Sequence, residues 1–369
     1  MKKIICFTGT RADYGIYRPL LLRLEKEKDI DLQLVVTGMH VVEEYGSTIK
    51  EIEKDDLTII AKPPILLKGD SKQEMAQSVG TAIILFSSIL YHSSPDGVLL
   101  LGDRGEMLAA VTAAHYQNIK TFHLHGGEKS GSADDAVRHA VSKLATYHFP
   151  ATNQSKERLI KMGEDAETIA VSGSLRKHDI TAIQQIEPRL RERWQNKFNL
   201  SKKPSLLFVM HPDSKDSTPF QTQIDSALQA LRALPEVNLI ILGSNSDAGG
   251  GVFRQEIKKF TQEMKNVLYY ESLPPDEYLF LLSQVDIILG NSSSGIIEAP
   301  FFQLPYLLIG KRQLDREHGG NVYVAPYISD KIERKIRMLL DSKRTESENP
   351  YDVTASPADT IVSQLKKWL

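Results

Sequence analysis

The sequence is poor in cysteine and in the segments that mark exported or membrane-bound proteins. Cys6 is the only cysteine, so neither an internal disulfide nor a cysteine-based metal site can form. It lies in the apolar run KIICFTG, which favours a buried thiol over a nucleophile. That run ends after about six residues, shorter than the core of a signal peptide. No segment has the ~18 uninterrupted apolar residues of a membrane span, so we expect a cytoplasmic protein with no membrane partner.

An excess of charge of either sign is also absent. Lys and Arg total 45 against 47 Asp and Glu, a formal charge of -2. Proteins that bind nucleic acid need a strongly basic face, so we expect no nucleic-acid partner. A local basic pocket for one anionic ligand stays compatible with this balance. Hydrophobic residues at 41% and charged residues at 25% are ordinary for a globular protein and exclude wholesale disorder.

Short apolar runs alternate with longer amphipathic stretches, for example 17–28, 75–92 and 275–283. The apolar runs are continuous rather than alternating, as in strands of a parallel sheet that are buried on both faces. This order predicts an α/β fold with doubly wound sheets. The expected strands are 3–9, 32–38, 57–62, 97–102, 120–126, 146–151, 168–173, 205–211, 238–243, 267–272, 285–290 and 306–310.

The 369 residues suffice for about two domains. The polar segment 178–205 separates the two series of strands and predicts a helix plus a linker. We therefore expect a Rossmann-like domain over 1–180 and a second one over 181–350. Residues 351–369 should end in an amphipathic helix that packs back on the first domain.

Many of the expected strands end in glycine-containing turns, where open α/β sheets bind ligands. None of these turns has the pattern GxGxxG, so we infer neither a dinucleotide nor any other cofactor.

Two clusters at strand ends of the first half carry charged side chains. In GTRADYG, Arg11 precedes a helix and can bind a phosphate or pair with Asp13. In LGDRGE, Asp103 and Arg104 follow a buried strand, where a carboxylate is costly unless it is paired or functional.

The densest cluster is HLHGGEKSGSADDAVRH at 123–139. On a strand, His123 and His125 would face the same side, and such a pair can bind zinc. No second histidine motif supports a metal, so we expect none and favour acid–base chemistry on one substrate. A solvated loop with local ion pairs is the alternative. The other titratable members of this cluster are Glu128, Asp134, Asp135, Arg138 and His139.

A fourth cluster comes from the second half. The turn GNSSSG follows a strand and opens a helix, so its hydroxyl and N–H groups could hold a diphosphate. Glu298 should lie about two turns into that helix, where it could accept hydrogen bonds from ribose hydroxyls. The other members are His211, Asn245, Asp247, Asn291, Ser292, Ser293 and Arg312.

Eight motifs in the same order resemble the UDP-N-acetylglucosamine 2-epimerases, in particular the hydrolysing branch that feeds sialic and related nonulosonic acid synthesis. The resemblance covers residues 3–325 and rests on GTRADYG, GMHVVEEYG, LGDRGE, HLHGGEKSGSADDAVRHA, MHPD, SNSDAG, GNSSSGIIE and GKRQLDREHGGNV. It implies two Rossmann-like domains of the GT-B type with UDP in the cleft between them. It also implies a homodimer or homotetramer.

The resemblance assigns roles to residues of both halves. It implies catalytic residues Asp103, His125, Asp134 and Arg138, with His40 and Glu128 nearby. The UDP-binding residues that it implies are Arg11, Arg104, His211, Asn245, Asp247, Ser292, Ser293, Glu298 and Arg312. The implied reaction eliminates UDP to give 2-acetamidoglucal, which water converts to N-acetylmannosamine.

One departure concerns residue 125, where many members of the family have Glu in HxEGGE. His125 can also act as a base near neutral pH. The substitution leaves the base and the sugar open. We expect UDP-N-acetylglucosamine first and UDP-N,N′-diacetylbacillosamine, of the legionaminic acid pathway, second. The rival functions are a non-hydrolysing epimerase, a GT-B glycosyltransferase and a nucleotide-sugar sensor without turnover.

Overall fold

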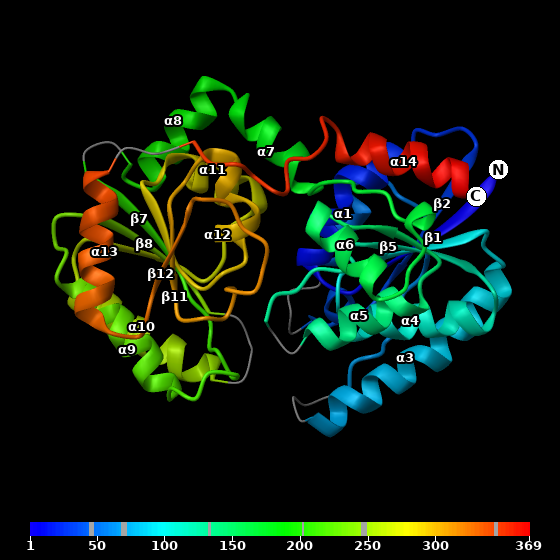
Figure 1. Cartoon of the computed structure of the whole chain (residues 1–369), viewed down its shortest axis with the longest axis horizontal. Helices are drawn as coiled ribbons and strands as arrows, with labels where there is room; N and C mark the ends of the chain where they lie inside the picture. The colour runs from blue at the N-terminus through cyan, green and yellow to red at the C-terminus, as the bar shows by residue number, and fades with distance from the viewer. Residues whose placement is uncertain (44–47, 68–71, 132–133, 201–202, 245–248, 343–345) are drawn as a thin grey trace. The chain divides into compact units, whose positions relative to one another are not determined.

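The computed structural model describes the whole chain except residues 44–47, 68–71, 132–133, 201–202, 245–248 and 343–345 (Figure 1). The chain divides into two compact units. Unit 1 comprises 1–128, 133–175 and 353–369, and unit 2 comprises 129–132 and 176–352. The sequence predicts boundaries at 180/181 and 350/351, within five residues of two of these transitions.

Unit 1 contains a six-stranded parallel sheet in the order β3-β2-β1-β4-β5-β6. Its central strands are apolar on both faces, as in β4, whose five residues are all buried. The strands are β1 (Lys2–Thr8), β2 (Ile30–Val36), β3 (Ile59–Ala61), β4 (Gly97–Leu101), β5 (Lys120–Leu124) and β6 (Tyr147–Phe149).

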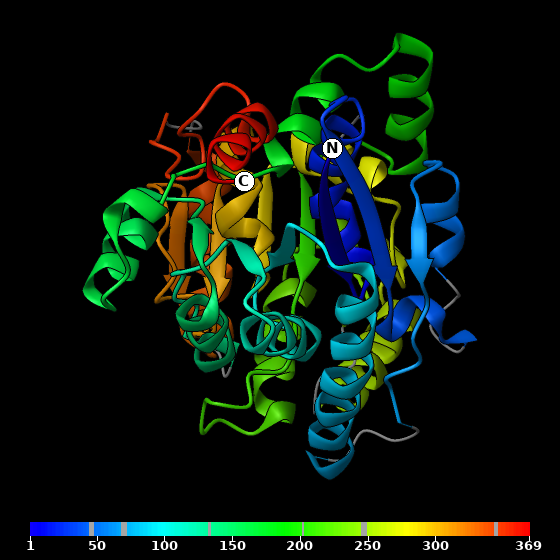
Figure 2. The same ribbon diagram turned by 90° about the vertical axis from the view of Figure 1, so that its right-hand side faces the viewer.

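Helices cover both faces of this sheet. α1 (Arg11–Leu24) and α14 (Pro357–Trp368) pack on one face, and α3 (Lys72–Ser93), α4 (Gly105–Tyr116) and α5 (Asp134–Leu144) pack on the other. Both chain termini belong to this unit, and Figure 2 marks where they lie. The remaining helices are η1 (Gly38–Val41), α2 (Ile49–Glu53), α6 (Asn153–Lys161) and η3 (Ala166–Thr168).

Helix α3 is unusual in its exposure. Within the described residues, its segment Gln73–Ser93 alone has the length and mean hydropathy of a membrane span, and only 22% of its most apolar window is buried. Its inner face packs Ala82, Phe86 and Leu90 into the core. Its outer face exposes large apolar side chains, of which Ile84 is 70% and Tyr91 73% exposed.

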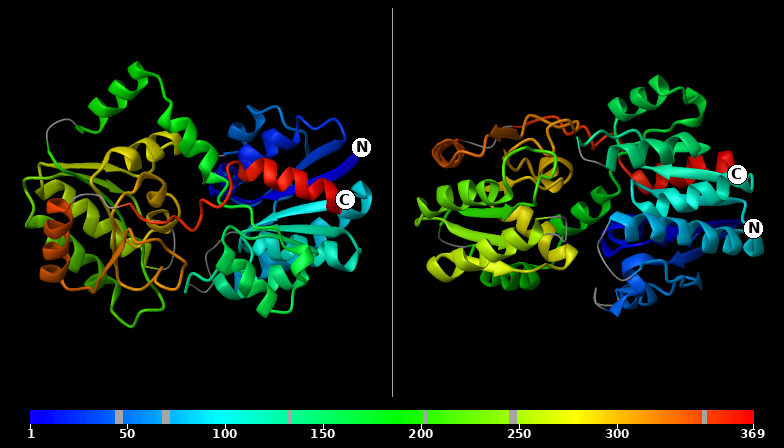
Figure 3. Two further views of the ribbon diagram at one scale, coloured as in Figure 1. Left: turned by 45° about the horizontal axis from the view of Figure 1, so that its top comes forward. Right: turned by 90° about the horizontal axis from the view of Figure 1, so that it is seen from below.

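Unit 2 repeats the strand order of unit 1, with a parallel sheet in the order β12-β11-β10-β7-β8-β9. Figure 3 shows the ribbon from two further directions, with the helices beside the strands. Helices α9, α10 and α13 bury their apolar faces on one side of it. The strands are β7 (Ser205–Val209), β8 (Asn238–Leu242), β9 (Val267–Tyr270), β10 (Ile287–Gly290), β11 (Tyr306–Ile309) and β12 (Val322–Ala325). The helices are α7 (Arg176–Gln184), α8 (Pro188–Lys197), α9 (Phe220–Arg232), α10 (Gly250–Glu263), α11 (Pro275–Gln284), α12 (Ser294–Ile297), η4 (Ala299–Phe302) and α13 (Ser329–Asp341).

The predicted fold class is confirmed, because both sheets are parallel and doubly wound with a Rossmann-like strand order. Two strand assignments differ from prediction. The expected strand 168–173 forms only a single bridge, between Ile169 and His148. The edge strand β12 was not expected, because its sequence VYVA is short and three of its four residues are partly or fully exposed.

Candidate functional site

In each unit the strand order reverses next to the strand that comes first in the chain. The reversal lies between β1 and β4 in unit 1 and between β7 and β10 in unit 2. Loops at the carboxyl ends of such strand pairs diverge and leave a crevice where doubly wound folds bind ligands. All four predicted clusters contain residues that follow strands at or beside these two points of reversal.

Arg138 pairs with two carboxylates of unit 1. Its guanidinium, almost fully buried, forms an ion pair with Asp103 and a second one with Asp135 at 2.8 Å. The same group donates to the carbonyl oxygen of Glu128 at 3.1 Å. Burial of the Asp103 carboxylate is thereby offset by a charged partner. Asp134 begins α5 one turn before Arg138 and is exposed.

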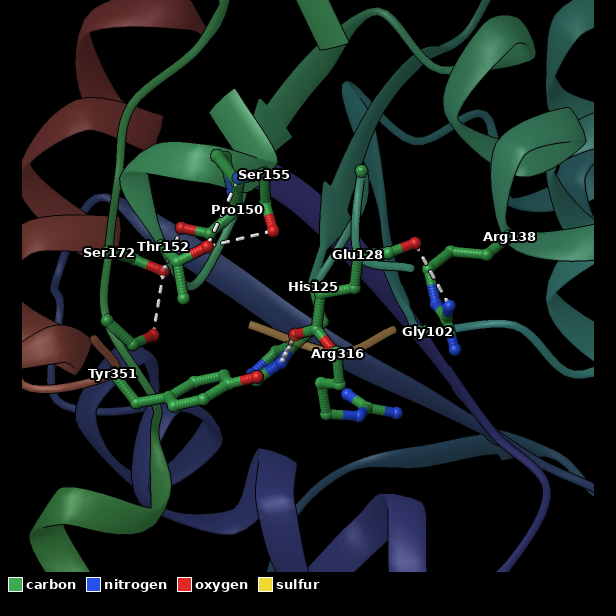
Figure 4. A network of polar contacts seen from close by, with 12 residues as sticks. Gly102, His125, Glu128, Arg138, Pro150, Thr152, Ser155, Ser172, Arg316 and Tyr351 are labelled. Carbon is green, nitrogen blue, oxygen red and sulfur yellow. Dashed lines mark hydrogen bonds and ion pairs between the residues drawn. The ribbon is translucent and has the colours of Figure 1, made fainter. Parts of the chain in front are cut away.

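His125 lies in a turn rather than on a strand (Figure 4). β5 ends at Leu124, and His125 adopts φ +58°, a left-handed conformation that few non-glycine residues take. Its N–H donates to the carbonyl of Phe149 at 3.0 Å. The expected strand 120–126 therefore ends two residues early, and His123 and His125 do not share one face of a strand because His125 lies in the turn that follows it.

The HGGE turn gives His125 a defined tautomer. Nδ1 donates to Oε1 of the buried Glu128 at 2.8 Å, because a carboxylate can only accept. The second nitrogen, Nε2, is buried and has no hydrogen-bond partner among the described residues. In the neutral ring this atom carries a lone pair. Gly127 is required here, because a Cβ at this position would lie 2.5 Å from the carbonyl oxygen of Ser155.

His123, on the strand before this turn, has a structural role. Nε2 donates to the carbonyl oxygen of Gly102 at 2.8 Å, and Nδ1 accepts from the hydroxyl of Ser142 at 3.1 Å. Burial lowers the pKa of His123 to about 3, so the ring is neutral at pH 7. Its hydrogen bond holds the carbonyl group of Gly102, the residue before Asp103, in place.

Arg104 lies between two carboxylates. Its Nε is 3.4 Å from Oε2 of Glu106 and 4.0 Å from Oδ2 of Asp13. Burial raises the pKa of Asp13 to about 6; Glu106 and Asp103 add to the rise and Arg104 opposes it. Neither Asp13 nor Glu106 was predicted as a site residue. Arg11, at the start of α1, pairs with Glu51 at 3.2 Å.

His40 is fully enclosed. Its ring nitrogens contact the hydroxyls of Thr8 at 3.1 Å and Thr48 at 2.7 Å. Burial lowers the pKa of His40 to about 4, so its ring is neutral and bridges β1 to the segment before α2. Both of its nitrogens are engaged within the protein.

In unit 2, Asn291 joins the two strands at the point of reversal. Its side chain accepts from the N–H of His211 at 2.8 Å and donates to the carbonyl of His211 at 2.7 Å. Arg312 donates to the carbonyl of Asn291 at 3.3 Å. The hydroxyl of Ser244, after β8, lies 3.5 Å from Nδ1 of His211.

The serine-rich turn continues from Asn291 into α12. Ser292 Oγ accepts from the N–H of Ser294 at 3.4 Å, and Ser293 is the N-terminal cap of the helix. Glu298 does not lie two turns into a helix as predicted, because α12 has only four residues and Glu298 follows its last one. Nε of Arg176 lies 3.3 Å from Oε1 of Glu298.

Part of the predicted set therefore forms one group in each unit, whereas Arg11, His40, Arg104 and Glu298 have other partners. The structure brings together Asp103, Arg138, His125 and Glu128 in unit 1, and His211, Ser292 and Arg312 around Asn291 in unit 2. Asn245 and Asp247 lie outside the described residues. Among those described, no group of three or more His, Cys, Asp and Glu side chains could hold a metal ion.

Two Rossmann-like units with acid–base groups in one and a serine-rich turn in the other are typical of enzymes that act on nucleotide-activated sugars. The family model described as UDP-N-acetylglucosamine 2-epimerase matches residues 22–366. The chain belongs to this family, and the resemblance predicted from its motifs is confirmed.

Three similar proteins illustrate the family. The chain is 40% identical to a UDP-N,N′-diacetylbacillosamine 2-epimerase (hydrolyzing) of Legionella pneumophila, over 95% of this chain and 92% of the relative. It is 33% identical to the polysialic acid biosynthesis protein P7 of Escherichia coli, over 95% and 90%. The crystal structure of UDP-GlcNAc 2-epimerase from Neisseria meningitidis bound to UDP-GlcNAc has a TM-score of 0.83, with 20% identity and full coverage of both chains.

Proposed function

We propose that this protein is a hydrolysing 2-epimerase that converts a UDP-linked 2-acetamido sugar and water into UDP and the free 2-epimeric sugar. The observation that carries the proposal is the group of proton-handling side chains after β4 and β5. Asp103 is paired with Arg138, and His125 is paired with Glu128. A glycosyltransferase that only replaces UDP with an acceptor needs no such set of acid–base groups at C2.

The chemistry requires several proton transfers. A base removes the proton on C2 while the C1–O bond breaks, and the bonding pair leaves with UDP; the product is a 2-acetamidoglucal. Water then adds its oxygen to C1, and a proton returns to C2 on the opposite face. The C2 proton is weakly acidic, so positive charge around the leaving diphosphate must supply much of the rate enhancement.

Residues of unit 1 supply the proton transfers in this proposal. Asp103, His125 and Asp134 are the acid and base candidates, and Arg138 orients Asp103 through their ion pair. The contact of Nδ1 with Glu128 leaves Nε2 of His125 as the atom that takes or returns a proton. His40 supports the loop after β2, since both its nitrogens are already engaged.

The UDP-binding residues in this proposal are those that the resemblance implies. Arg312, the serine-rich turn and the positive groups after β1 and β4 neutralise the diphosphate, and Glu298 accepts from the ribose hydroxyls. The full proposed set is Arg11, Arg104, His211, Asn245, Asp247, Ser292, Ser293, Glu298 and Arg312.

The names of two relatives decide how we rank the two candidate sugars. The 40% identical protein is named for UDP-N,N′-diacetylbacillosamine, and the 33% identical one for polysialic acid synthesis. We therefore rank UDP-N,N′-diacetylbacillosamine ahead of UDP-N-acetylglucosamine, which reverses the order expected from the sequence. Either reaction serves nonulosonic acid synthesis in the cytoplasm.

The decisive experiment is incubation of the purified protein with each UDP-sugar in D₂O, followed by proton NMR. Free UDP together with the 2-epimeric sugar deuterated at C2 supports the proposal. A deuterated sugar still attached to UDP indicates a non-hydrolysing epimerase and contradicts the proposal. Loss of UDP without exchange at C2 indicates simple hydrolysis or glycosyl transfer and also contradicts it.

Two variants separate chemistry from binding in the same assay. Asp134→Asn should lower turnover at least about 100-fold while UDP affinity stays within about twofold, because it removes an acid–base group. Arg312→Ala should weaken UDP binding about tenfold or more, because it removes a charged partner of the diphosphate. Near-normal turnover in Asp134→Asn would show that this carboxylate is not catalytic.

We also propose a homodimer built on the outer face of α3. The chain from Met75 to Ser93 contains no Asp, Glu, Lys or Arg, although this face is exposed. A charge-free surface is complementary to itself, and an isologous pair of helices buries it in two copies at once. Gly80 adds room for close approach, since a Cβ there would meet no heavy atom within 4 Å.

A further inference from the structure

Glu298 and Arg176 form a buried ion pair whose purpose is not explained by the fold alone. The side chains are 11% and 14% exposed. Arg176 is the first residue of α7 and the first after the chain leaves unit 1 at Leu175. Glu298 lies 122 residues further along the chain, directly after α12.

Glu298 lies at the junction of two short helical segments. α12 is a single turn, and Glu298 and Gln303 bracket the 3₁₀ segment η4 that follows it. A carboxylate at such a position needs a partner, both to offset the cost of burial and to select one rotamer. Arg176 is this partner, since its Nε lies 3.3 Å from Oε1 of Glu298.

Arg176 is itself held in place. Nη1 donates to Oδ2 of Asp179, one turn further along α7, at 3.2 Å. A guanidinium can form both contacts at once because its donors are arranged in a rigid fork, whereas the ammonium of a lysine is a single point. The ion pair with Glu298 involves Oε1, so Oε2 is not required to hold the pair together.

We propose that Arg176 is a positioning residue of the nucleotide site, which orients Glu298 to accept hydrogen bonds from the ribose hydroxyls and so makes the site selective for ribonucleotides. The inference rests on the proposed function, in which Glu298 meets the ribose. Arg176 acts only through Glu298 and does not contact the nucleotide.

The test is isothermal titration of the full-length protein with UDP, 2′-deoxy-UDP and 3′-deoxy-UDP. The wild-type protein should bind UDP at least about tenfold more tightly than one of the deoxy analogues, the value of a hydrogen bond to a charged group. Arg176→Met should reduce that ratio to about threefold or less, and Glu298→Gln should do the same. The double variant should lose no further selectivity, since both changes break one interaction.

Controls keep a folding defect apart from a positioning defect. Arg232→Met makes the same substitution at an exposed ion pair of unit 2, with Glu263, and should keep the wild-type ratio. Arg176→Lys retains the charge and should give an intermediate ratio. If Arg176→Met does not fold, judged by circular dichroism, the lysine variant decides: an unchanged ratio contradicts the inference.

The results of this titration can be told apart from a failure of the proposed function. A folded Arg176→Met variant with the wild-type ratio overturns the positioning role, and so does a wild-type protein that binds all three nucleotides equally. Neither result affects the C2 exchange measured in D₂O. A wild-type protein that binds no UDP overturns both.

Discussion

At the scale of single residues, the site is a set of charges whose burial is offset by specific partners. Arg138 neutralises Asp103, Glu128 holds one tautomer of His125, and Arg176 holds Glu298. Asp13 is the exception, because its Oδ2 is buried without a hydrogen-bond partner among the described residues and Arg104 is 4.0 Å away. Such a carboxylate destabilises the folded state when it ionises.

Replacing Asp13 with Asn should reveal this cost as a function of pH. The pKa of Asp13 rises from 3.8 to about 6 through burial, so between these values the folded state binds more protons than the unfolded state. Wild-type stability is therefore lost as pH rises through this range. Relative to wild type, Asp13→Asn should gain up to roughly 3 kcal/mol between pH 4 and pH 7, measured by urea unfolding.

Asp96→Asn is a control for which the stability difference from wild type should change with pH in the opposite direction. The backbone N–H of Lys3 and the Lys2 side chain lower the pKa of Asp96. Wild type should therefore be favoured over Asp96→Asn at neutral pH and lose that advantage as pH falls below 4. A pH-independent stability difference for Asp13→Asn would mean that Asp13 ionises at its ordinary pKa.

At the scale of elements, the C-terminal helix completes the core of unit 1. α14 packs with α1 on one face of the sheet, although the two helices are more than 300 residues apart in sequence. The Trp368 ring stacks on Tyr147 at 4.6 Å between centroids and lies 5.2 Å from Phe149. Lys120 donates to the carbonyl of Trp368 at 2.8 Å.

Trp368→Ala should loosen this helix without changing the site. We expect a loss of about 2 kcal/mol, below the 3–5 kcal/mol of a fully buried aromatic, because the ring is only partly buried. Hydrogen exchange should accelerate in α14 and α1 and stay unchanged in α9 of unit 2. Met338→Ala, at a side chain 49% exposed, is the control and should change nothing measurable. Unchanged protection of α14 would show that the ring stack does not hold the helix.

At the scale of the whole molecule, two units with the same strand order carry different parts of the proposed function. Unit 1 carries the acid–base groups, and unit 2 carries the serine-rich turn and Glu298. Unit 1 also carries α3, whose exposed apolar outer face is explained neither by the core of the unit nor by its candidate site.

Ile84→Glu should disrupt the proposed dimer. Ile84 is 70% exposed, so a charge there costs little in the monomer, whereas two copies at an isologous interface would bury both charges. The dimer dissociation constant should rise about 100-fold or more, measured by light scattering after gel filtration. Met338→Glu, on an exposed face of unit 2, should leave it unchanged. A wild-type protein that is monomeric at all concentrations would contradict the proposal.

Local patterns in the sequence were enough to predict the fold class, the family and the residues at the strand ends. Continuous apolar runs mark buried parallel strands, and charged residues directly after them mark the ligand edge of a sheet. β12 was missed because an edge strand has no such run, and the helical position of Glu298 was wrong because the length of α12 depends on its packing.

The pairing of these residues could not be predicted and follows from the folded chain. Arg138 with Asp103, Arg104 with Asp13 and Arg176 with Glu298 join positions between 35 and 122 residues apart, and no local pattern encodes such contacts. The left-handed turn at His125 depends on contacts with β6 and α6 that hold it there. Burial and partners, rather than residue type, set which of these groups can exchange a proton, and both are properties of the folded chain.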